Sequence, residues 1–543
     1  MKMKMKMKKR IYINDWLLFK PYEHPVKTDM YYLRICNDVK RVLCADNNFF
    51  TLANRFDEKE INSLACFLTS YFEDIISGTN IWKSFVRVHM RLYNKQLPFY
   101  DLQEYYEGEI NTQEVCFLTW YFFNTIQDEI FFNPFNPFFL EAAGAVMSVF
   151  DDAWDHAPEN DDLSSFYRMN DTERDFYAAR QFVETVLFRT YLFGIDSIPV
   201  LEEKNDEIIT KYRNDEKLMF FLNENTDALI HHHRTRLLAF TGKEWAAEII
   251  GESHPLKSDF LEMSPKIQGY FLYKGQDQTD VFIEHIASGK RFHLTKKSFD
   301  HADKLKVIDT IIFIGIVKWK GEWWFSGTYF QAPFNKELVA YEKSSIQSRA
   351  QVNFLDHQSN DVDEMLKQQE KAFLDFNHGS PIAFLPVGET EGFMKAYMEF
   401  FNKSLNLSEK EIKESEERIR KEGMKKPDDQ SFDFPEDFET GLVFFNPKSG
   451  CEMVFEVNSA FPLPDNPYFR PELSEEHIQC LLMDESISSE LVMFCIDNCR
   501  EELPFFNAGP GQLYLEDIDF LLRFWKRDNY YTLPAVTLIG QKE

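Results

Sequence analysis

The feature that most constrains the fold is a pair of strand-like runs in Asp309–Gln331, DTIIFIGIVKWKGEWWFSGTYFQ. β-Branched and aromatic residues dominate both runs, which is typical of β-strands. Between the runs, Lys320-Gly321-Glu322 places a glycine where a tight hairpin turn needs a positive backbone φ angle. The segment therefore predicts two neighbouring antiparallel strands.

Three further short runs lie upstream of this hairpin. Val281–Ala287 and Lys290–Thr295 flank Ser288-Gly289 as a second hairpin, and Gly269–Lys274 adds a fifth strand. Short strands joined by tight turns are typical of small antiparallel barrels. We predict an SH3-like or OB-like β-barrel over residues 263–335, a fold that serves many functions and so identifies none of them.

Residues 28–262 predict a domain built of helices. Asp57 with Glu60, and Asn111 with Glu114, have the spacing of capping boxes ahead of apolar runs. Aromatic residues make up 16% of the chain, with 54 Phe, which favours bulky cores between packed helices.

One motif of this region occurs twice. Cys66–Phe72, CFLTSYF, is echoed by Cys116–Phe122, CFLTWYF, at an offset of 50 residues. Helical repeats have periods of this size. Because the flanking residues differ, two similar buried helices and a stacked pair of helical hairpins both remain possible.

The chain of 543 residues is too long for a single core. We predict an α+β fold class with a helical N-terminal domain, the small central barrel and a C-terminal α/β portion with a mixed sheet. The sheet would contain strands at Ile382–Val387, Gly441–Phe445, Glu452–Val457 and Ala535–Ile539. The remaining segments are a tail and leading segment at 1–27, an α-β-α unit at 336–423 that ends in a highly charged helix, a linker at 424–437 and an α+β unit at 438–543.

Composition narrows the class of protein. The formal net charge of −29 opposes a general nucleic-acid role, because phosphate binding requires a basic face. Eight scattered cysteines without CxxC spacing indicate reduced thiols. No apolar run reaches the roughly 20 residues of a membrane span, and MKMKMKMKKR lacks the apolar stretch of a signal peptide. We therefore expect an acidic cytoplasmic protein with no membrane contact, whose opening residues are a solubilising tail or an over-extended start.

Searches for catalytic motifs find no glycine-rich phosphate loop, no GxSxG and no HExxH. The most suggestive residues are Asp227, His231 and His233. Asp227 and His231 are one helical turn apart and share a face, a workable spacing for metal ligands. His231 to His233 cannot all share that face, because successive helical residues turn by about 100°. A polar helix surface is the alternative interpretation.

A second group of acidic residues follows a predicted helix, at Asp151, Asp152, Asp155 and His156. Clustered carboxylates can hold Mg²⁺ or act as acid and base. In so acidic a chain, a solvated loop explains the same cluster. We expect no cofactor and no catalytic metal.

The predicted barrel carries a local excess of basic residues interleaved with aromatic ones. Such a surface can bind single-stranded nucleic acid, although strand alternation turns about half of the aromatic side chains inward. It can equally contact acidic surfaces of the same chain or of an acidic protein partner. The candidate binding residues are Lys290, Arg291, Lys296, Lys297, Lys318 and Lys320.

Three stretches together resemble an uncharacterised bacterial family, a domain of unknown function. They are Asp15–Val39, the barrel segment GIVKWKGEWWFSGTYFQ and the ending LYLEDIDFLLRFWKRDNY. The region Trp245–Leu405 is also similar to a barrel-plus-α-β region of other uncharacterised bacterial proteins, some of which end in a zinc-binding Cys/His tail. The final residues VTLIGQKE contain neither Cys nor His, so the resemblance implies no zinc and supplies no catalytic residues.

These observations favour a non-enzymatic interaction or regulatory protein. One alternative is a metal-dependent or hydrolase-like enzyme that uses the acidic and histidine residues of the helical domain. Another is a single-strand nucleic-acid-binding protein that uses the barrel. Substrate, partner identity and oligomeric state do not follow from the sequence.

Overall fold

The computed structural model describes residues 10–45, 52, 54–102, 105–127, 130–299, 302–353, 360–405, 408, 410, 413 and 438–531. The predicted linker at 424–437 and strand at 535–539 lie outside these residues, as do most of the tail and most of the charged helix after 408. The chain divides into two compact units, Met1–Lys266 with Val317–Thr328, and Ile267–Ile316 with Tyr329–Glu543. Each unit is described separately below.

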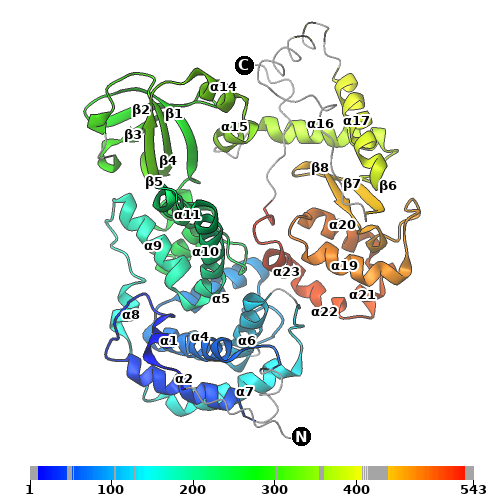
Figure 1. Ribbon diagram of the computed structural model, residues 1–543. Coiled ribbons are helices and arrows are strands. Elements are labelled where there is room, and N and C mark those ends of the chain that lie inside the picture. Colours follow the sequence, from blue (N-terminus) through cyan, green and yellow to red (C-terminus); the bar gives the residue numbers. More distant parts are fainter. Residues whose placement is uncertain are drawn as a thin grey trace. The chain divides into compact units, whose positions relative to one another are not determined.

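Helices build the first unit, as predicted for the N-terminal region (Figure 1). Among the described residues, no helix has both the length and the apolar character needed to cross a membrane. The helices are α1 (Ile13–Leu17), α2 (Asp29–Leu43), α4 (Glu58–Ser77), α5 (Ile81–Tyr93), α6 (Thr112–Ile126), α7 (Pro137–Trp154), α8 (Asp161–Ser165), α9 (Phe176–Arg189), α10 (Tyr191–Tyr212), α11 (Leu218–His232), α12 (Gly242–Ile250) and α13 (Lys257–Glu262).

One of the two predicted capping boxes forms. Asp57 accepts a hydrogen bond from the backbone N–H of Glu60, and the Glu60 carboxylate accepts one in return. At Asn111 the prediction is wrong, because that side chain makes no cap hydrogen bond. Glu114 is buried in the core, where its carboxylate accepts hydrogen bonds from other side chains.

Aromatic side chains fill the core of the first unit. Both copies of the echoed motif are buried, one in α4 and the other in α6. The rings of Phe67 and Phe122 lie with centroids 5.6 Å apart, and those of Phe72 and Phe150 stack at 4.7 Å. Such pairs add stabilisation beyond their buried area, which explains the bulky composition of these helices.

The five predicted strands form a five-stranded sheet in the order β1-β2-β3-β5-β4. Strand β1 pairs antiparallel with both β2 and β4. Positive φ angles at Lys320 and Gly321 make the predicted turn between the last two strands, and the hairpin segment Val317–Thr328 belongs to the first unit. The strands are β1 (Ile267–Gln276), β2 (Asp280–His285), β3 (Arg291–Thr295), β4 (Ile311–Trp319) and β5 (Glu322–Ala332).

A second sheet lies in the C-terminal part of the chain, with strand order β6-β7-β8. Both strand pairs are antiparallel, so the prediction of a mixed sheet is wrong for the described residues. Short connections explain the difference at β7 and β8, which are neighbours in sequence and pair as a hairpin. The strands are β6 (Ile382–Pro386), β7 (Thr440–Asn446) and β8 (Gly450–Phe455).

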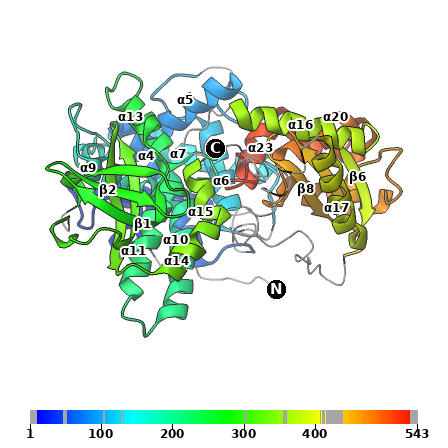
Figure 2. The same cartoon turned by 90° about the horizontal axis from the view of Figure 1, so that it is seen from above.

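Helices cover both faces of this sheet. The side chains of β7 alternate between the two faces, so each face presents apolar side chains to the helices that cover it. Val443 and Phe445 pack with Phe373 and Tyr397 of the helices that lie along β6 and β8 (Figures 1 and 2). Phe444 points the other way and contacts Phe494. The helices of this part are α14 (Lys336–Ser344), α15 (Ile346–Asn353), α16 (Asn360–Phe376), α17 (Val387–Ser404), α19 (Ser474–Met483), α20 (Ser489–Cys499), α21 (Pro504–Asn507), α22 (Gly511–Tyr514) and α23 (Ile518–Trp525).

Candidate functional site

The structure brings Asp227 and His231 together inside the first unit. Both lie on α11, and the Asp227 Oδ1 and His231 Nε2 atoms are 3.9 Å apart. Their shared face follows from the one-turn spacing. That face points into the protein, since Asp227 is 0% exposed and His231 is 8% exposed.

Cations from outside α11 neutralise this face. Lys266, immediately before β1, places Nζ 2.6 Å from the Asp227 Oδ2 and also pairs with Glu224. Arg180 of α9 places Nε 2.6 Å from the Asp227 Oδ1 and reaches Glu184 on its own helix. Buried carboxylates require such partners, because an unpaired buried charge costs several kcal/mol.

Strand β5 supplies two hydroxyl side chains to the cluster. The Ser326 hydroxyl lies 2.9 Å and 3.0 Å from the two Asp227 carboxylate oxygens and 3.0 Å from the His231 Nε2. The Thr328 backbone N–H and hydroxyl both donate to the Glu224 Oε2, at 2.9 Å and 2.5 Å. We call these seven residues the α11 cluster: Arg180, Glu224, Asp227, His231, Lys266, Ser326 and Thr328.

Gly327 lets β5 approach the α11 cluster. Its φ angle is +83°, and an added Cβ atom would lie 2.6 Å from the Glu224 Oε2, 2.7 Å from the Asp227 Oδ2 and 2.7 Å from the Lys266 Nζ. Real Cβ contacts are not this short, so only glycine fits here without moving the charged groups.

The charges fix the protonation of the cluster at neutral pH. Burial raises the pKa of Asp227, but the positive charges of Lys266 and Arg180 outweigh it and hold the value at about 2. Burial dominates at His231 and lowers its pKa to about 3. Asp227 is therefore ionised at neutral pH, and His231 is neutral.

This protonation decides what the Ser326, His231 and Asp227 side chains can do chemically. An ionised carboxylate only accepts hydrogen bonds, so Ser326 donates its proton to Asp227. The Ser326 oxygen must then accept from the His231 Nε2–H. A catalytic triad needs the opposite order, with histidine accepting the serine proton and aspartate contacting the histidine. The arrangement links helix to strand and does not activate the serine.

Sequence reasoning identified only part of the α11 cluster. It missed Arg180, which lies on another helix, and it missed Lys266, Ser326 and Thr328, which lie within the segment 263–335 that was interpreted as the barrel. Glu224 could have been found, because it precedes Asp227 by three residues and shares its helical face.

The other predicted metal or acid–base candidates do not join the α11 cluster. His233 follows the last residue of α11 as its C-cap, where the backbone becomes extended. Asp151, Asp152, Asp155 and His156 are exposed at the end of α7. Within the described ranges, no group of three or more His, Cys, Asp or Glu side chains is arranged to hold a metal ion.

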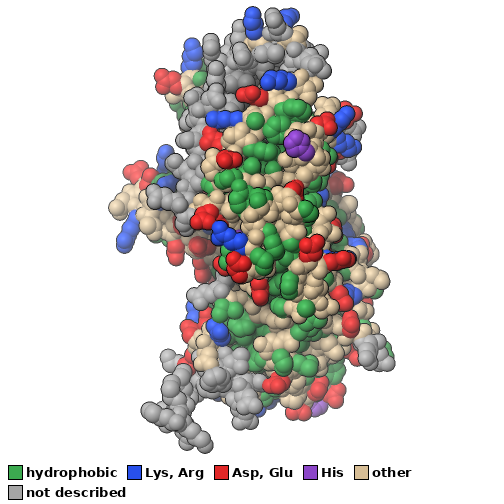
Figure 3. Space-filling model, turned by 90° about the vertical axis from the view of Figure 1, so that its right-hand side faces the viewer, with side chains coloured by type: hydrophobic (Ala, Val, Ile, Leu, Met, Phe, Trp, Pro, Cys, Tyr) green, Lys and Arg blue, Asp and Glu red, His purple; other side chains and the backbone are tan. Residues whose placement is uncertain are grey.

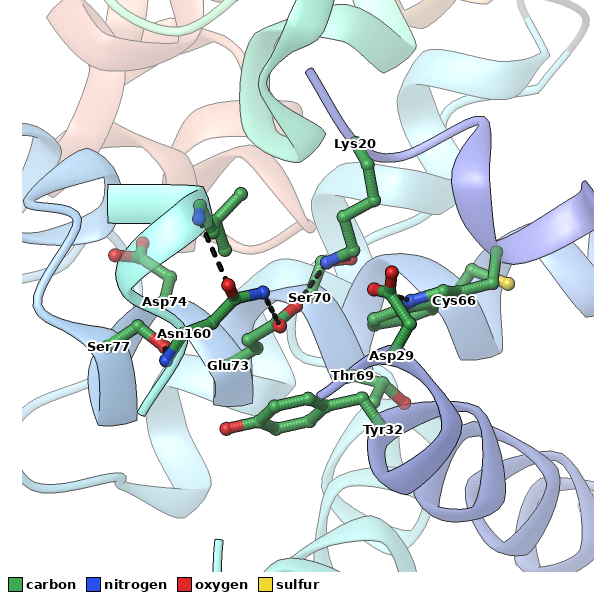
Figure 4. Close-up of polar contacts among 12 residues, drawn as sticks. Lys20, Asp29, Tyr32, Cys66, Thr69, Ser70, Glu73, Asp74, Ser77 and Asn160 are labelled. Carbon is green, nitrogen blue, oxygen red and sulfur yellow. Dashed lines mark hydrogen bonds and ion pairs between the residues drawn. The ribbon is translucent and has the colours of Figure 1, made fainter. Parts of the chain in front are cut away.

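A second buried ion pair lies near the N-terminus of the first unit (Figure 4). Lys20 pairs with Glu73 of α4, and the other Glu73 oxygen accepts from the Asn160 amide at 2.8 Å. The Lys20 ammonium lies 3.8 Å from the ring centroid of Trp16, whose indole N–H donates to Asp29 at 2.8 Å. These contacts fasten the leading segment, which includes Trp16 and Lys20, onto α2 and α4.

Two further buried carboxylates, Asp74 of α4 and Glu114 of α6, are held by neutral donors. Trp82 donates its backbone N–H to Asp74 at 2.8 Å and its indole N–H to Glu114 at 2.6 Å. Tyrosine hydroxyls also donate hydrogen bonds to these carboxylates, from Tyr191 to Asp74 and from Tyr71 to Glu114. Burial raises the pKa of both carboxyl groups and outweighs these hydrogen bonds, which act to lower it.

The predicted basic surface divides between the two units. In the first unit, Lys320 pairs with Asp259 at 2.8 Å, and Lys318 is exposed on β4. In the second unit, Arg291 pairs with Glu284 at 3.0 Å. The other three basic residues, Lys290, Lys296 and Lys297, also lie at the surface, with Lys296 half-buried.

The architecture places the protein among α+β proteins with a helical N-terminal region. Residues 10–278 match the model of a family described as a protein of unknown function, DUF3843. This match confirms the resemblance to a family without an assigned activity. It spans the α11 cluster up to Lys266, whereas Ser326 and Thr328 lie beyond it. No curated protein and no solved structure matches the chain.

Proposed function

We propose that the protein is a non-enzymatic interaction or regulatory protein of the bacterial cytoplasm. The observation that carries this proposal is the environment of Asp227 and His231, the residues whose spacing in the sequence suits metal ligands. Both are buried, and both are committed to hydrogen bonds and ion pairs within the first unit. Their role is to hold α11 against β5, which leaves interaction with other molecules to the surface.

The basic residues of the sheet support an acidic protein partner. Where the structure gives an ion pair for one of them, the counter-ion is a carboxylate of the same chain: Glu284 for Arg291 and Asp259 for Lys320. A neighbouring protein can offer the same chemistry to this surface, on which Lys290, Arg291 and Lys297 are exposed. Opposite charges across such an interface speed association and favour the correct partner.

Charge reversal tests this proposal. Chemical cross-linking in a bacterial lysate, near physiological ionic strength, is compared for the parent and two variants with equal charge changes. The first converts Lys290, Arg291, Lys296 and Lys297 to Glu. The matched control converts three lysines and one arginine that are exposed in the first unit, namely Lys204, Lys211, Arg213 and Lys217.

We expect a cross-linked protein that the parent and the control retain and that the first variant loses. Identical cross-linked sets for all three chains would contradict the proposal.

Metal analysis examines the enzyme alternative. Stoichiometric metal in protein purified without added metal, lost on combining Asp227→Asn with His231→Gln, would favour that alternative.

We further propose that the five-stranded sheet is a closed barrel of SH3-like or OB-like type. The pairing of β1 with both β2 and β4 supports closure, since a strand order that begins at β1 and ends at β4 then returns to its start.

A second candidate function is single-strand nucleic-acid binding, which one observation favours. Tyr270, Phe313 and Phe330 project from β1, β4 and β5 and form a group on the second unit, with ring centroids 5.1–6.0 Å apart. None is fully buried, and Phe330 is 37% exposed. Bases of any sequence can stack on such rings.

Fluorescence anisotropy with labelled single-stranded DNA and RNA tests this candidate at about 0.15 M salt. Under the leading proposal, we expect no binding tighter than the 10⁻⁴–10⁻⁶ M typical of non-specific contacts. Submicromolar binding that weakens on Phe313→Ala and Phe330→Ala, but not on Phe334→Ala, would place nucleic-acid binding first. Phe334 is the control because it is also exposed and lies four residues beyond Phe330.

A further inference from the structure

Two thiols from different helices meet in the core of the first unit. The Cys36 Sγ of α2 and the Cys66 Sγ of α4 are 3.4 Å apart, and both side chains are 0% exposed. The residues are 30 positions apart in sequence. A covalent bond between them would therefore join two packed helices.

We propose that Cys36 and Cys66 are an oxidation site at which hydrogen peroxide, or another small two-electron oxidant, creates a disulfide between α2 and α4. The geometry is the basis of the proposal. The sulfur atoms are already in contact, so once one sulfur is oxidised the second thiol is held beside it at high effective concentration.

The reaction consumes one peroxide for each disulfide formed. One thiolate attacks a peroxide oxygen, and the oxygen–oxygen bond breaks to give a sulfenic acid and, after proton uptake, water. The second thiol attacks the sulfenic sulfur, the sulfur–sulfur bond forms, and the sulfenic oxygen leaves as a second water. Two thiols and one peroxide become one disulfide and two waters, with the sulfur atoms oxidised and the peroxide reduced.

The surroundings of the thiols set the rate of this reaction. Burial is the main cause that raises the pKa of Cys66, and the nearby Lys20 ammonium partly opposes it (Figure 4). Because the thiolate is the reactive form, oxidation is slow at neutral pH and accelerates as the pH rises. Local opening of the packed helices admits the oxidant.

The chain contains an internal comparison. Cys495 and Cys499 are one turn apart on α20, and the Cys495 thiol donates to the Ala460 carbonyl at 3.2 Å. Side chains one turn apart on a helix point in similar directions, so a disulfide between them would distort the helix. Contact between two thiols on one helix therefore does not predict a disulfide.

The experiment uses the full chain with Cys480→Ser, which removes an exposed thiol that could link two molecules. The protein is treated with hydrogen peroxide under native conditions, remaining thiols are alkylated, and intact mass and digested peptides are measured. We expect a loss of two hydrogens per chain and a linked peptide pair containing Cys36 and Cys66. The rate should rise about tenfold per pH unit below the thiol pKa.

Two matched variants complete the test. Cys36→Ala and Cys36→Ser, in the same background, should show no such linked pair. The oxidised chain should unfold at a higher urea concentration than the reduced chain, and dithiothreitol should abolish the shift. Absence of the linked pair, its formation only after denaturation, or a Cys495–Cys499 link in its place would overturn the proposal. The parent chain provides these readouts even if both variants fail to fold.

Discussion

At the scale of single residues, ordinary amino acids have functions set by their surroundings. Asp227 and His231 have the spacing of metal ligands, yet Lys266 and Ser326 bind them within the buried α11 cluster. Gly327 is required because three charged groups surround the place where a side chain would be. Helical periodicity predicted the Asp227–His231 pair. It could not predict Lys266 or Ser326, because tertiary packing brings them in from other elements.

Gly327→Ala should destabilise the protein more than Gly321→Ala. Both glycines have a φ angle of +83°, but an added Cβ atom at Gly321 meets nothing within 4 Å. Backbone strain alone costs about 1 kcal/mol in Gly321→Ala. Overpacking adds about 1–3 kcal/mol at Gly327, so we expect a total of about 2–4 kcal/mol there. Urea unfolding measures both variants, and equal losses would show that the α11 cluster tolerates the added methyl group.

The neutral His231 predicts loss of stability in mild acid. Its pKa is about 3 in the folded protein and about 6.5 when unfolded, so between these values only the unfolded chain binds the proton. Stability therefore falls as the pH decreases from 6.5 towards 3, by up to about 1.4 kcal/mol per pH unit. Asp227 contributes at lower pH, between its unfolded pKa of 3.8 and its folded pKa of about 2.

His231→Gln tests this prediction through the slope of unfolding free energy between about pH 5 and pH 6. The slope should become shallower by the contribution that His231 alone makes to it. Some slope remains because burial also lowers the pKa values of His89 and His285 to about 4. Replacement of the exposed His293 by Gln is the control. An unchanged slope in the His231 variant would mean that this imidazole titrates normally.

At the scale of elements, local sequence patterns predicted the strands and hairpins. They did not predict the features that depend on tertiary packing. Alternation and turn glycines predicted the five strands of the first sheet, because both signals are local. The hairpin of β7 and β8 was predicted for the same reason. The mixed pairing was wrong for the three described strands of that sheet, because strand direction depends on distant pairing. The capping box at Asn111 failed because Glu114 finds better partners in the core.

Trp319 and Trp323 flank the β4–β5 turn, and the two tryptophans should differ in their contribution to stability. Trp319 is 0% exposed and packs on Phe260 of α13, with ring centroids 5.2 Å apart, while Trp323 is half-buried. Trp319→Ala should cost about 3–5 kcal/mol, and Trp323→Ala less, because more of its ring already contacts water. Thermal and urea unfolding compare them. A parent-like Trp319→Ala protein would show that this hairpin packs loosely on α13.

At the scale of the whole molecule, charge is the dominant property. The chain carries a formal net charge of −29, and the face drawn in Figure 3 intersperses acidic, basic and hydrophobic side chains. Charge of one sign repels itself within a compact structure. The buried ion pairs of Lys20 and Lys266 are separated from solvent, so salt screens them much less than the surface.

Added salt should therefore stabilise the protein. Raising the ionic strength from about 0.01 M to about 0.15 M shortens the Debye length from about 30 Å to about 8 Å and weakens repulsion between surface carboxylates. We expect a higher midpoint of urea unfolding at the higher salt concentration. The difference between Gly327→Ala and Gly321→Ala should stay constant, because it reports on buried contacts. A lower midpoint would show that surface ion pairs outweigh the net charge.

The discontinuous first unit also has a consequence for biosynthesis. Its residues lie on both sides of the Ile267–Ile316 segment, and Ser326 and Thr328 come last. A nascent chain that has been synthesised only as far as Glu262 holds Glu224 and Asp227 without Lys266, Ser326 or Thr328. The ribosome must add Lys266, all of β1 to β4 and most of β5 before these carboxylates gain their full set of partners. Completion of the helical unit is thus delayed until well after its last helix has been synthesised.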